Sequence, residues 1–373
     1  MDHAGPAEVP AEVIVLTPAG RGAVATVLVA GSHATDLVER HFHSASGHSL
    51  AGQPLERILF GRWGTSDGEE LVVVRRSASA VEIHCHGGQA AVAAIVAALE
   101  QHGCRQVAWR EWNRRQSPDL IAAEAIEALA DARTARTAAI LLDQLNGALS
   151  SELRQIAEYI QWGETSAAQR RTDELLDRAH VGRHLTEPFR LVLAGPPNAG
   201  KSSLINALLG YARAIVCETP GTTRDVVTAA AAFGGWPVEL ADTAGLRATD
   251  ERLEAEGIRR ARQQLAAADL VLLVFDASVA WNDADEQLVR EYPRAMVVHN
   301  KCDLAPLDDL RPAGLRTSAL VGTGLEALIA NIEVQLVPSP RDAGQAVPFT
   351  PRQVEALQAA RALLAAGSIV SRW

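Results

Sequence analysis

The chain contains two lysines, and each lies in a short motif whose residues could bind part of a nucleotide. Lys201 is in Gly-Pro-Pro-Asn-Ala-Gly-Lys-Ser (195–202), and Lys301 is in Asn-Lys-Cys-Asp (300–303). Every other Lys or Arg position in the chain carries arginine, so these two positions indicate a need for a compact ammonium on a slender stem. Together the motifs predict the phosphate end and the base end of one pocket.

The first motif fits G-x-x-x-x-G-K-[ST] and lies between a predicted strand (191–194) and a predicted helix (203–209). Glycines let backbone N–H groups curl around phosphate oxygens, and the helix N-terminus adds its positive end. Taken alone, the motif has an alternative interpretation as a glycine-rich turn without a ligand. We expect Lys201 to reach the β- and γ-phosphates and Ser202 to ligate Mg²⁺. The phosphate-binding residues predicted here are Asn198, Ala199, Gly200, Lys201, Ser202 and Ser203.

Two further segments follow in the order that a phosphate-sensing switch requires. Thr222 and Thr223 lie in the polar run 221–225, and Thr223 is the candidate for a second Mg²⁺ oxygen. Asp242 begins Asp-Thr-Ala-Gly after a predicted strand (237–241) and can hold Mg²⁺, while the N–H of Gly245 can meet the γ-phosphate. Loss of that phosphate would release both loops.

The second lysine motif predicts guanine as the base. The carboxylate of Asp303 can accept from both N1–H and the 2-amino group of guanine, and adenine offers neither donor. Lys301 can lay its stem along the base, and Asn300 completes the motif. Thr317-Ser318-Ala319 fits a final loop that offers a backbone N–H to the base oxygen, so Ser318 and Ala319 join the predicted site.

The pattern of strands and helices between 188 and 337 predicts a doubly wound α/β domain with buried parallel strands at 191–194, 237–241, 270–275 and 295–299. Residues 1–116 are predicted as a separate α/β domain, with a strand at 107–109 among others. Residues 117–187 are predicted as helical, and 338–373 as a linker and one last helix that Thr350-Pro351 begins.

Composition limits the class of protein. The net charge of −10 argues against nonspecific coating of nucleic acid, and the 48% hydrophobic content supplies real cores. The four cysteines form no CxxC pair, which predicts reduced thiols in a cytoplasmic protein. No apolar run reaches membrane-spanning length, so no membrane partner is expected.

The residue that activates water is left open by the motifs alone. Leu246 stands directly after Asp-x-x-Gly, where a glutamine would orient water, and leucine cannot do so. Arg224, Arg247 and Glu254 are polar candidates on the flanking segments, each of which could equally be a solvated charge.

The chain resembles the bacterial tRNA modification GTPase family called MnmE or TrmE. The matching stretches include 195–206, Ala-Ile-Val-Cys-Glu-Thr-Pro-Gly-Thr-Thr-Arg-Asp (214–225), Asp-Thr-Ala-Gly-Leu-Arg (242–247), Thr-Pro-Ala-Gly-Arg-Gly (17–22) and Val-Glu-Ile-His-Cys-His-Gly-Gly (81–88). The resemblance covers most of the chain. It implies an α/β architecture: a Ras-like P-loop GTPase domain inserted in a reduced helical domain, plus an N-terminal α/β folate-binding-like domain that forms a homodimer.

The resemblance also implies roles for residues that the motifs leave open. Glu254 falls on the family's catalytic acid, which orients or activates water. Asn198 falls on the asparagine that helps bind K⁺ beside the phosphates, where the ion acts as an arginine finger when two G domains meet. Thr219 and Thr222 lie in the loop that completes the K⁺ site, and Cys217 stands there where the family usually has threonine.

Two departures from the family bear on its one-carbon chemistry. The family ends in Cys-x-Gly-Lys, whereas this chain ends in Ser-Ile-Val-Ser-Arg-Trp. Leu28, Ala78 and Ser117 stand where the family contacts formyl-tetrahydrofolate with an arginine, a glutamate and a lysine, so binding of that cofactor is not expected.

Two functions therefore stay open. The first is a GTPase dependent on Mg²⁺ and K⁺ that acts in tRNA wobble-uridine modification with an MnmG-like flavoprotein and tRNA. The second is a divergent paralogue that acts as a GTP-driven interaction switch without folate binding or tRNA modification. A ribosome-associated GTPase is a weaker third, because it would want a basic RNA-binding appendage and the sequence shows none.

Overall fold

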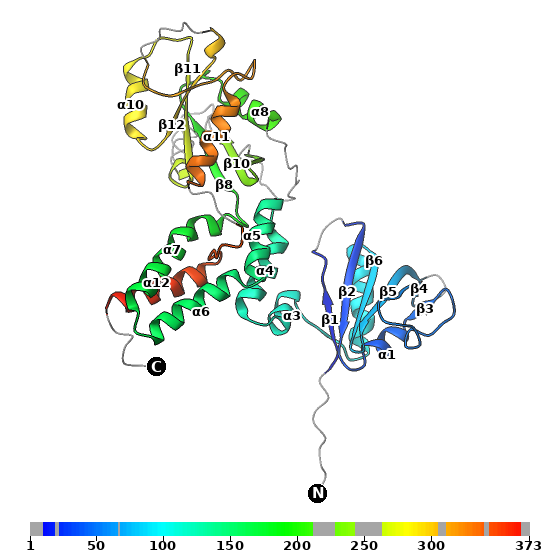
Figure 1. Cartoon of the computed structure of the whole chain (residues 1–373). Coiled ribbons are helices and arrows are strands. Elements are labelled where there is room, and N and C mark those ends of the chain that lie inside the picture. The colour runs from blue at the N-terminus through cyan, green and yellow to red at the C-terminus, as the bar shows by residue number, and fades with distance from the viewer. Residues whose placement is uncertain are drawn as a thin grey trace. The chain divides into compact units, whose positions relative to one another are not determined.

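The computed structural model describes residues 10–18, 22–65, 68–211, 228–242, 263–304, 311–338 and 343–366. The chain divides into two compact units, Met1–Leu120 and Ile121–Trp373. The fold is mixed α/β, with a sheet in each unit and a helical region in the second (Figure 1). The predicted boundaries within the second unit remain proposals.

The first unit is built on a seven-stranded sheet with the order β3-β4-β5-β6-β2-β1-β7. Neighbouring strands are antiparallel except β1 and β7, which are parallel. The strands are β1 (Glu12–Val15), β2 (Val24–Ala30), β3 (Phe42–Ser44), β4 (Ile58–Trp63), β5 (Glu69–Ser77), β6 (Ala80–His86) and β7 (Arg105–Gln106).

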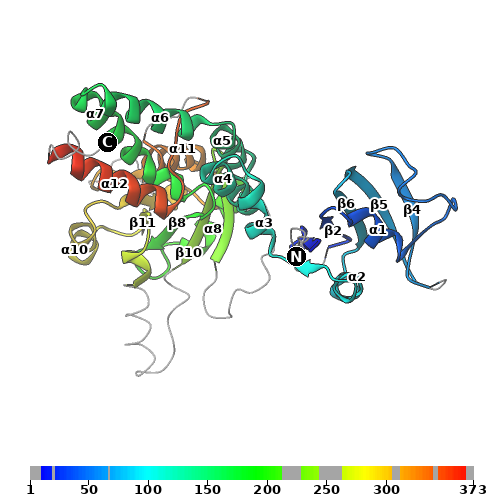
Figure 2. The same cartoon turned by 90° about the horizontal axis from the view of Figure 1, so that it is seen from below.

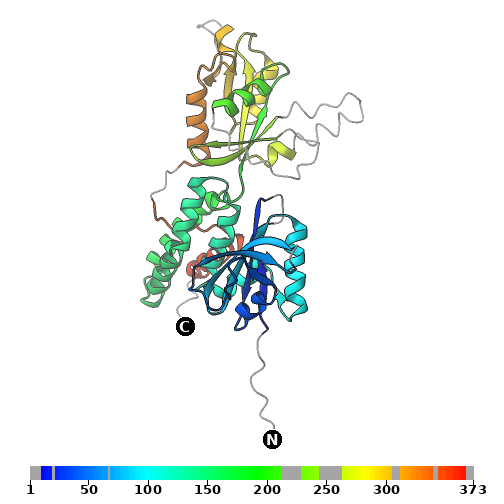
Figure 3. The ribbon, with the colours of Figure 1, turned by 90° about the vertical axis from the view of Figure 1, so that its right-hand side faces the viewer.

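Alternating burial gives this sheet one fully covered face. In β6, Val81, Ile83 and Cys85 point into the core and the residues between them do not, which is the period-two pattern of a strand with one buried face. Helices α1 (Ala34–Glu39) and α2 (Gln89–Gln101) contribute to that core, and α2 lies along one face of the sheet (Figure 3).

The predicted strand at 107–109 is wrong. The strand in this region is β7, two residues earlier, and Trp109 begins helix α3 (Trp109–Gln116). Val107 is buried with Ile14 and Leu28 against the sheet, where Trp109 also packs. An apolar segment of three residues is too short to show the hydrophobic periodicity that separates a strand from a helix. The prediction of a strand therefore rested on its apolar side chains alone.

The second unit contains a six-stranded sheet with the order β13-β12-β11-β8-β10-β9. All neighbours are parallel except the β9–β10 hairpin, so the predicted doubly wound architecture is confirmed. Helices pack beside this sheet (Figure 2). The elements are β8 (Phe189–Ala194), α8 (Lys201–Tyr211), β9 (Thr228–Phe233), β10 (Trp236–Asp242), β11 (Leu270–Asp276), α10 (Asp283–Glu291), β12 (Met296–Asn300), η2 (Cys302–Leu304), β13 (Leu315–Arg316) and α11 (Leu325–Leu336).

Helices from both ends of the second unit form its helical layer. Four precede the sheet and one follows it: α4 (Leu120–Asp131), α5 (Ala135–Leu145), α6 (Ala148–Gln161), α7 (Thr165–Arg183) and α12 (Pro351–Ala365). α12 begins with a capping box at Thr350, as predicted, and packs against α7 (Figure 1). Arg352 of α12 also donates to both carboxylate oxygens of Glu124 in α4, at 2.6 and 2.8 Å. The sheet is therefore inserted between helices that pack together.

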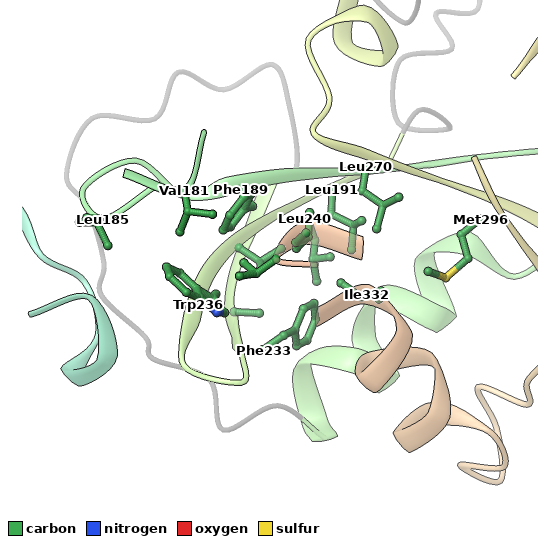
Figure 4. Close-up of a cluster of buried hydrophobic side chains, with 14 of the residues drawn as sticks. Val181, Leu185, Phe189, Leu191, Phe233, Trp236, Leu240, Leu270, Met296 and Ile332 are labelled. Atoms are coloured by element: carbon green, nitrogen blue, oxygen red, sulfur yellow. The ribbon is translucent and has the colours of Figure 1, made fainter. Parts of the chain in front are cut away.

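One hydrophobic core joins the helical layer to the sheet (Figure 4). Val181 of α7 and Leu185, two residues after that helix, belong to it together with Phe189 of β8 and Trp236 of β10. The Phe189 and Trp236 rings meet edge to face with centroids 6.0 Å apart. The chain thus passes from α7 into β8 through a buried junction.

The start of α5 also holds the turn between β9 and β10. Thr134, the N-cap of α5, donates from Oγ1 to the carbonyl of Gly235 at 2.6 Å. Arg136 donates to the carbonyl of Gly234 at 2.6 Å, and its guanidinium lies 5.0 Å from the Trp236 ring centroid. Since β10 ends at Asp242, this hairpin runs from the helical layer to the predicted phosphate end of the site.

Candidate nucleotide-binding site

The loop between β8 and α8 has the backbone that its glycines allow. Gly195 has φ +138°, and a Cβ there would lie 2.1 Å from the carbonyl oxygen of Val274. Gly200 has φ +86°, and a Cβ there would lie 2.4 Å from Nδ2 of Asn300. Asn198 adopts the left-handed region at φ 61°. Gly195 is therefore required by close packing against backbone and Gly200 by close packing against a side chain, and the loop curls at the N-terminus of α8.

Lys201 is folded into this loop. Lys201 is 5% exposed, and its Nζ donates to the carbonyl oxygens of Gly195 at 3.0 Å and Pro196 at 2.8 Å. A buried ammonium placed inside a curl of backbone at a helix N-terminus makes the surroundings strongly positive. The arrangement suits a polyanion such as a di- or triphosphate.

Ser202 and Asp242 come together although 40 positions separate them. Ser202 Oγ, in the first turn of α8, donates to Oδ2 of Asp242 at the end of β10, at 2.5 Å. A hydroxyl and a carboxylate at this separation form a hard-oxygen donor pair, which is the ligand type that Mg²⁺ prefers. These two residues therefore fit the predicted Mg²⁺ role.

Asn300 joins the phosphate loop to the predicted base loops. It is 1% exposed, and its Nδ2 donates to the carbonyl of Ala199 at 3.0 Å. Its Oδ1 accepts from the backbone N–H of Ala319 at 3.1 Å and from the Thr317 hydroxyl at 3.4 Å. One buried amide thus fixes the separation between the two ends of the pocket.

The base end is carried by two loops that hydrogen-bond to each other. Asp303 is exposed in η2, and the N–H of Cys302 donates to the carbonyl of Thr317 at 3.0 Å. Ser318 is fully buried, and its Oγ accepts from the N–H of Val321 at 3.3 Å. An open carboxylate beside a rigid loop is the arrangement that recognition of a guanine edge needs.

Lys301 has a partner that the sequence did not suggest. Its backbone is left-handed at φ 59°, and its Nζ donates to Oδ2 of Asp276 at 2.6 Å. Asp276 is the last residue of β11 and lies opposite Asn300 in the register of β12. Its position after a buried apolar run, at the same sheet edge as the motif, is the signal that could have identified it.

The structure thus brings the described predicted residues to the carboxyl edge of one sheet, where doubly wound folds bind ligands. These residues are Asn198, Ala199, Gly200, Lys201, Ser202, Ser203, Asp242, Asn300, Lys301, Asp303, Ser318 and Ala319. The other predicted residues, together with the alternative candidates for water activation, lie outside the described residues: Cys217, Thr219, Thr222, Thr223, Arg224, Gly245, Arg247 and Glu254.

The three positions that the family resemblance aligns with folate contacts carry apolar or small side chains. Leu28 is 4% exposed and packs with Ile14 and Val107, while Ala78 lies in the turn between β5 and β6. Ser117 is the C-cap of α3 and donates from its hydroxyl to Asn113 at 3.2 Å. None of these side chains carries a charge for the folate's carboxylates or a hydrogen-bonding pair for its pterin.

Comparisons with known proteins point in one direction. A family model described as 50S ribosome-binding GTPase matches residues 190–301. The chain is 35% identical to the tRNA modification GTPase MnmE of Symbiobacterium thermophilum, over 93% of this chain and 86% of that protein. It is 34% identical to the protein of the same name from Syntrophotalea carbinolica, over 86% of this chain and 80% of that one.

Solved structures that resemble the chain include Era of Aquifex aeolicus bound to GDP and AlF4⁻. The identity is 27% over 41% of this chain and 57% of that one, with a TM-score of 0.32. Among the described residues, no helix is both long enough and apolar enough to cross a membrane.

Proposed function

Because the chain belongs to the MnmE family of tRNA modification GTPases, we propose that it binds GTP at the edge of the second sheet and hydrolyses it to GDP and phosphate there. The observation that carries this proposal is Asn300, whose amide ties the phosphate loop to both base loops. The proposed site therefore holds the phosphate and base ends of one ligand at a fixed separation.

In this proposal, some of the described residues bind the phosphates of GTP and others bind its base. The loop of residues 195–200 and Lys201 hold the phosphates and balance charge that builds up on them during hydrolysis. Ser202 and Asp242, with Thr223, would hold Mg²⁺, which supplies further neutralisation of the phosphate oxygens. Asp303 selects guanine, and the loop of Ser318 and Ala319, held by the bond from the Ala319 N–H to Asn300, lies at the same end.

Hydrolysis also needs a water oriented toward the γ-phosphate and a positive charge beside the phosphates. We assign the first to Glu254 and the second to K⁺ held by Asn198 with Cys217, Thr219 and Thr222, with Gly245 at the γ-phosphate. The K⁺ site is completed when the G domains of two chains meet, so the proposed state is a homodimer that also pairs through residues 1–116.

The free thiols of Cys85 and Cys104 suit a cytoplasmic location.

A GTPase assay tests this mechanism. Turnover should be faster in K⁺ than in Na⁺, and Glu254→Ala should leave GTP binding intact while it slows hydrolysis by about a hundredfold or more. Equal rates in the two salts would remove the K⁺ assignment. Unchanged turnover of Glu254→Ala would remove Glu254 from the mechanism.

The chain is associated with tRNA modification through its family, and the proposed partners are tRNA and an MnmG-like flavoprotein. The poor fit of Leu28, Ala78 and Ser117 to folate favours the second candidate, a GTP-driven interaction switch without that chemistry. Expression in a strain deficient in wobble-uridine modification separates the two. Restored modified uridine in the strain's tRNA, measured by mass spectrometry, would contradict the switch; its absence, with the protein expressed and active on GTP, would support it.

A further inference from the structure

Asp276 is fixed at both of its carboxylate oxygens. Oδ2 accepts from Nζ of Lys301 at 2.6 Å, and Oδ1 accepts from the N–H of Ser278 at 2.9 Å and from its hydroxyl at 2.6 Å. The Asp276 side chain is 16% exposed. A carboxylate held by these bonds has one orientation, so it offers the ammonium a fixed anchor.

The backbone that carries Asp276 is itself braced. The guanidinium of Arg311 donates to the carbonyl of Asp276 at 2.9 Å, to that of Ala277 at 3.0 Å and also to that of Val279. It lies 5.9 Å from the centroid of the Trp281 ring. The N–H of Ala277 donates to the carbonyl of Asn300 at 2.7 Å. The loop after β11 and the start of the base loop therefore form one rigid piece.

The stem of Lys301 runs between its anchor and the phosphate loop. An ideal Cβ at Gly200 would lie 3.7 Å from Cε of Lys301, so the hydrocarbon passes beside the phosphate loop before the ammonium reaches Asp276. A free lysine stem has many rotamers, and ordering it costs free energy when a ligand binds. Anchoring the ammonium in advance removes part of that cost.

We propose that Asp276 is a positioning residue for guanine binding, which anchors the Lys301 ammonium so that the lysine stem is already held where it lies along the base. Arg311 supports this role by fixing the loop that carries Asp276. The inference rests on the proposed function, because it concerns the same GTP site. It also explains why position 301 is a lysine in an arginine-rich chain. The slender stem ends in a point charge that reaches Asp276, and its methylene groups can still contact a base.

Electrostatics keep this anchor charged. Burial raises the pKa of Asp276, but the Lys301 ammonium and the two bonds from Ser278 together outweigh it, so the pKa lies below its ordinary value. The carboxylate is therefore ionised at neutral pH.

The test uses the full chain and the variant Asp276→Asn, with GTP, GDP and inorganic pyrophosphate as ligands. We expect the Kd for GTP and for GDP to rise together by about tenfold, because both nucleotides share the base end. The Kd for pyrophosphate and the kcat at saturating GTP should stay within about twofold of wild type, because the phosphate end is untouched. A general loosening of the fold would weaken pyrophosphate binding as well, and that result would overturn the proposal.

A double-mutant cycle shows whether Asp276 acts through Lys301. Lys301→Met keeps the hydrocarbon and removes the ammonium, so adding Asp276→Asn to it should change the GDP affinity no further. Additive losses, or wild-type affinity in Asp276→Asn alone, would overturn the proposal. Asp283→Asn, which removes an exposed acid from the start of α10, is the matched control and should bind like wild type. A wild-type chain that binds neither GTP nor GDP would instead reject the proposed function itself.

Discussion

At the scale of residues, the site depends on a few side chains that connect loops far apart in sequence. Asn300 bonds to Ala199 and to Ala319, and Ser202 bonds to Asp242. Each bond fixes one loop against another at the carboxyl edge of the sheet. Asp303, the residue proposed to contact the distinguishing edge of the base, is exposed, so its effect should be on ligand choice more than on folding.

Asp303→Asn should change which base the site accepts. An amide can donate to the 2-oxo group of xanthine, whereas it cannot accept from both guanine donors at once. We expect GTP affinity to fall about a hundredfold and XTP affinity to rise, since hydrogen bonds to a charged group are worth about 1.5–3 kcal/mol each. Competition binding with GTP and XTP measures the switch, and a variant that keeps its preference for GTP would contradict the role of Asp303.

The sequence predicted those residues that lie in fixed local spacings and missed those that depend on strand register. Gly195, Lys201 and Asn300 were predicted because their motifs follow strands within a few positions. Asp276 and Arg311 were not, because their partners lie on another strand or loop, and only the pairing of β11 with β12 brings Asp276 opposite Asn300. The apolar run before Asp276 indicates that it lies at the sheet edge, but the sequence does not show which strand pairs with β11 or in which register.

At the scale of elements, the β9–β10 hairpin is held at both ends. Its turn bonds to Thr134 and Arg136 at the start of α5, and β10 ends at Asp242 in the site. Gly235 has φ +81°, and a Cβ there would lie 3.0 Å from the Arg136 side chain. Because glycine has no side chain, the turn leaves room for Arg136. The helical layer and the site are thereby joined through one two-stranded element.

Removing the contact at the turn should cost stability. Thr134→Ala loses both the capping box of α5 and the bond to Gly235, so we expect the free energy of unfolding to fall by about 1–2 kcal/mol. Urea unfolding measures the change. Arg133→Ala, one position earlier and exposed, is the control and should change stability by less than about 0.5 kcal/mol. Equal stability of Thr134→Ala and wild type would show that the turn is not held from α5.

At the scale of the whole molecule, the described residues of the proposed nucleotide site all belong to the second unit, where a sheet is inserted between helices. The insertion was implied by the family resemblance rather than by periodicity, because no local pattern shows that α12 returns to pack on α7 and bonds to Glu124. The first unit carries the departures at Leu28, Ala78 and Ser117. The residues proposed for GTP chemistry and those aligned with the family's folate contacts thus lie in different units of the chain.

We propose that this chain carries a guanine-nucleotide site at the carboxyl edge of its second sheet. Calorimetric titration of the full chain with GTP, GDP and ATP, in Mg²⁺ and K⁺, tests it most directly. GTP and GDP should bind with Kd values in the range of about 1–100 μM, and ATP about a hundredfold or more weaker, because adenine leaves the Asp303 carboxylate unpaired. Equal affinity for ATP and GTP, or no binding of either guanine nucleotide, would contradict the account.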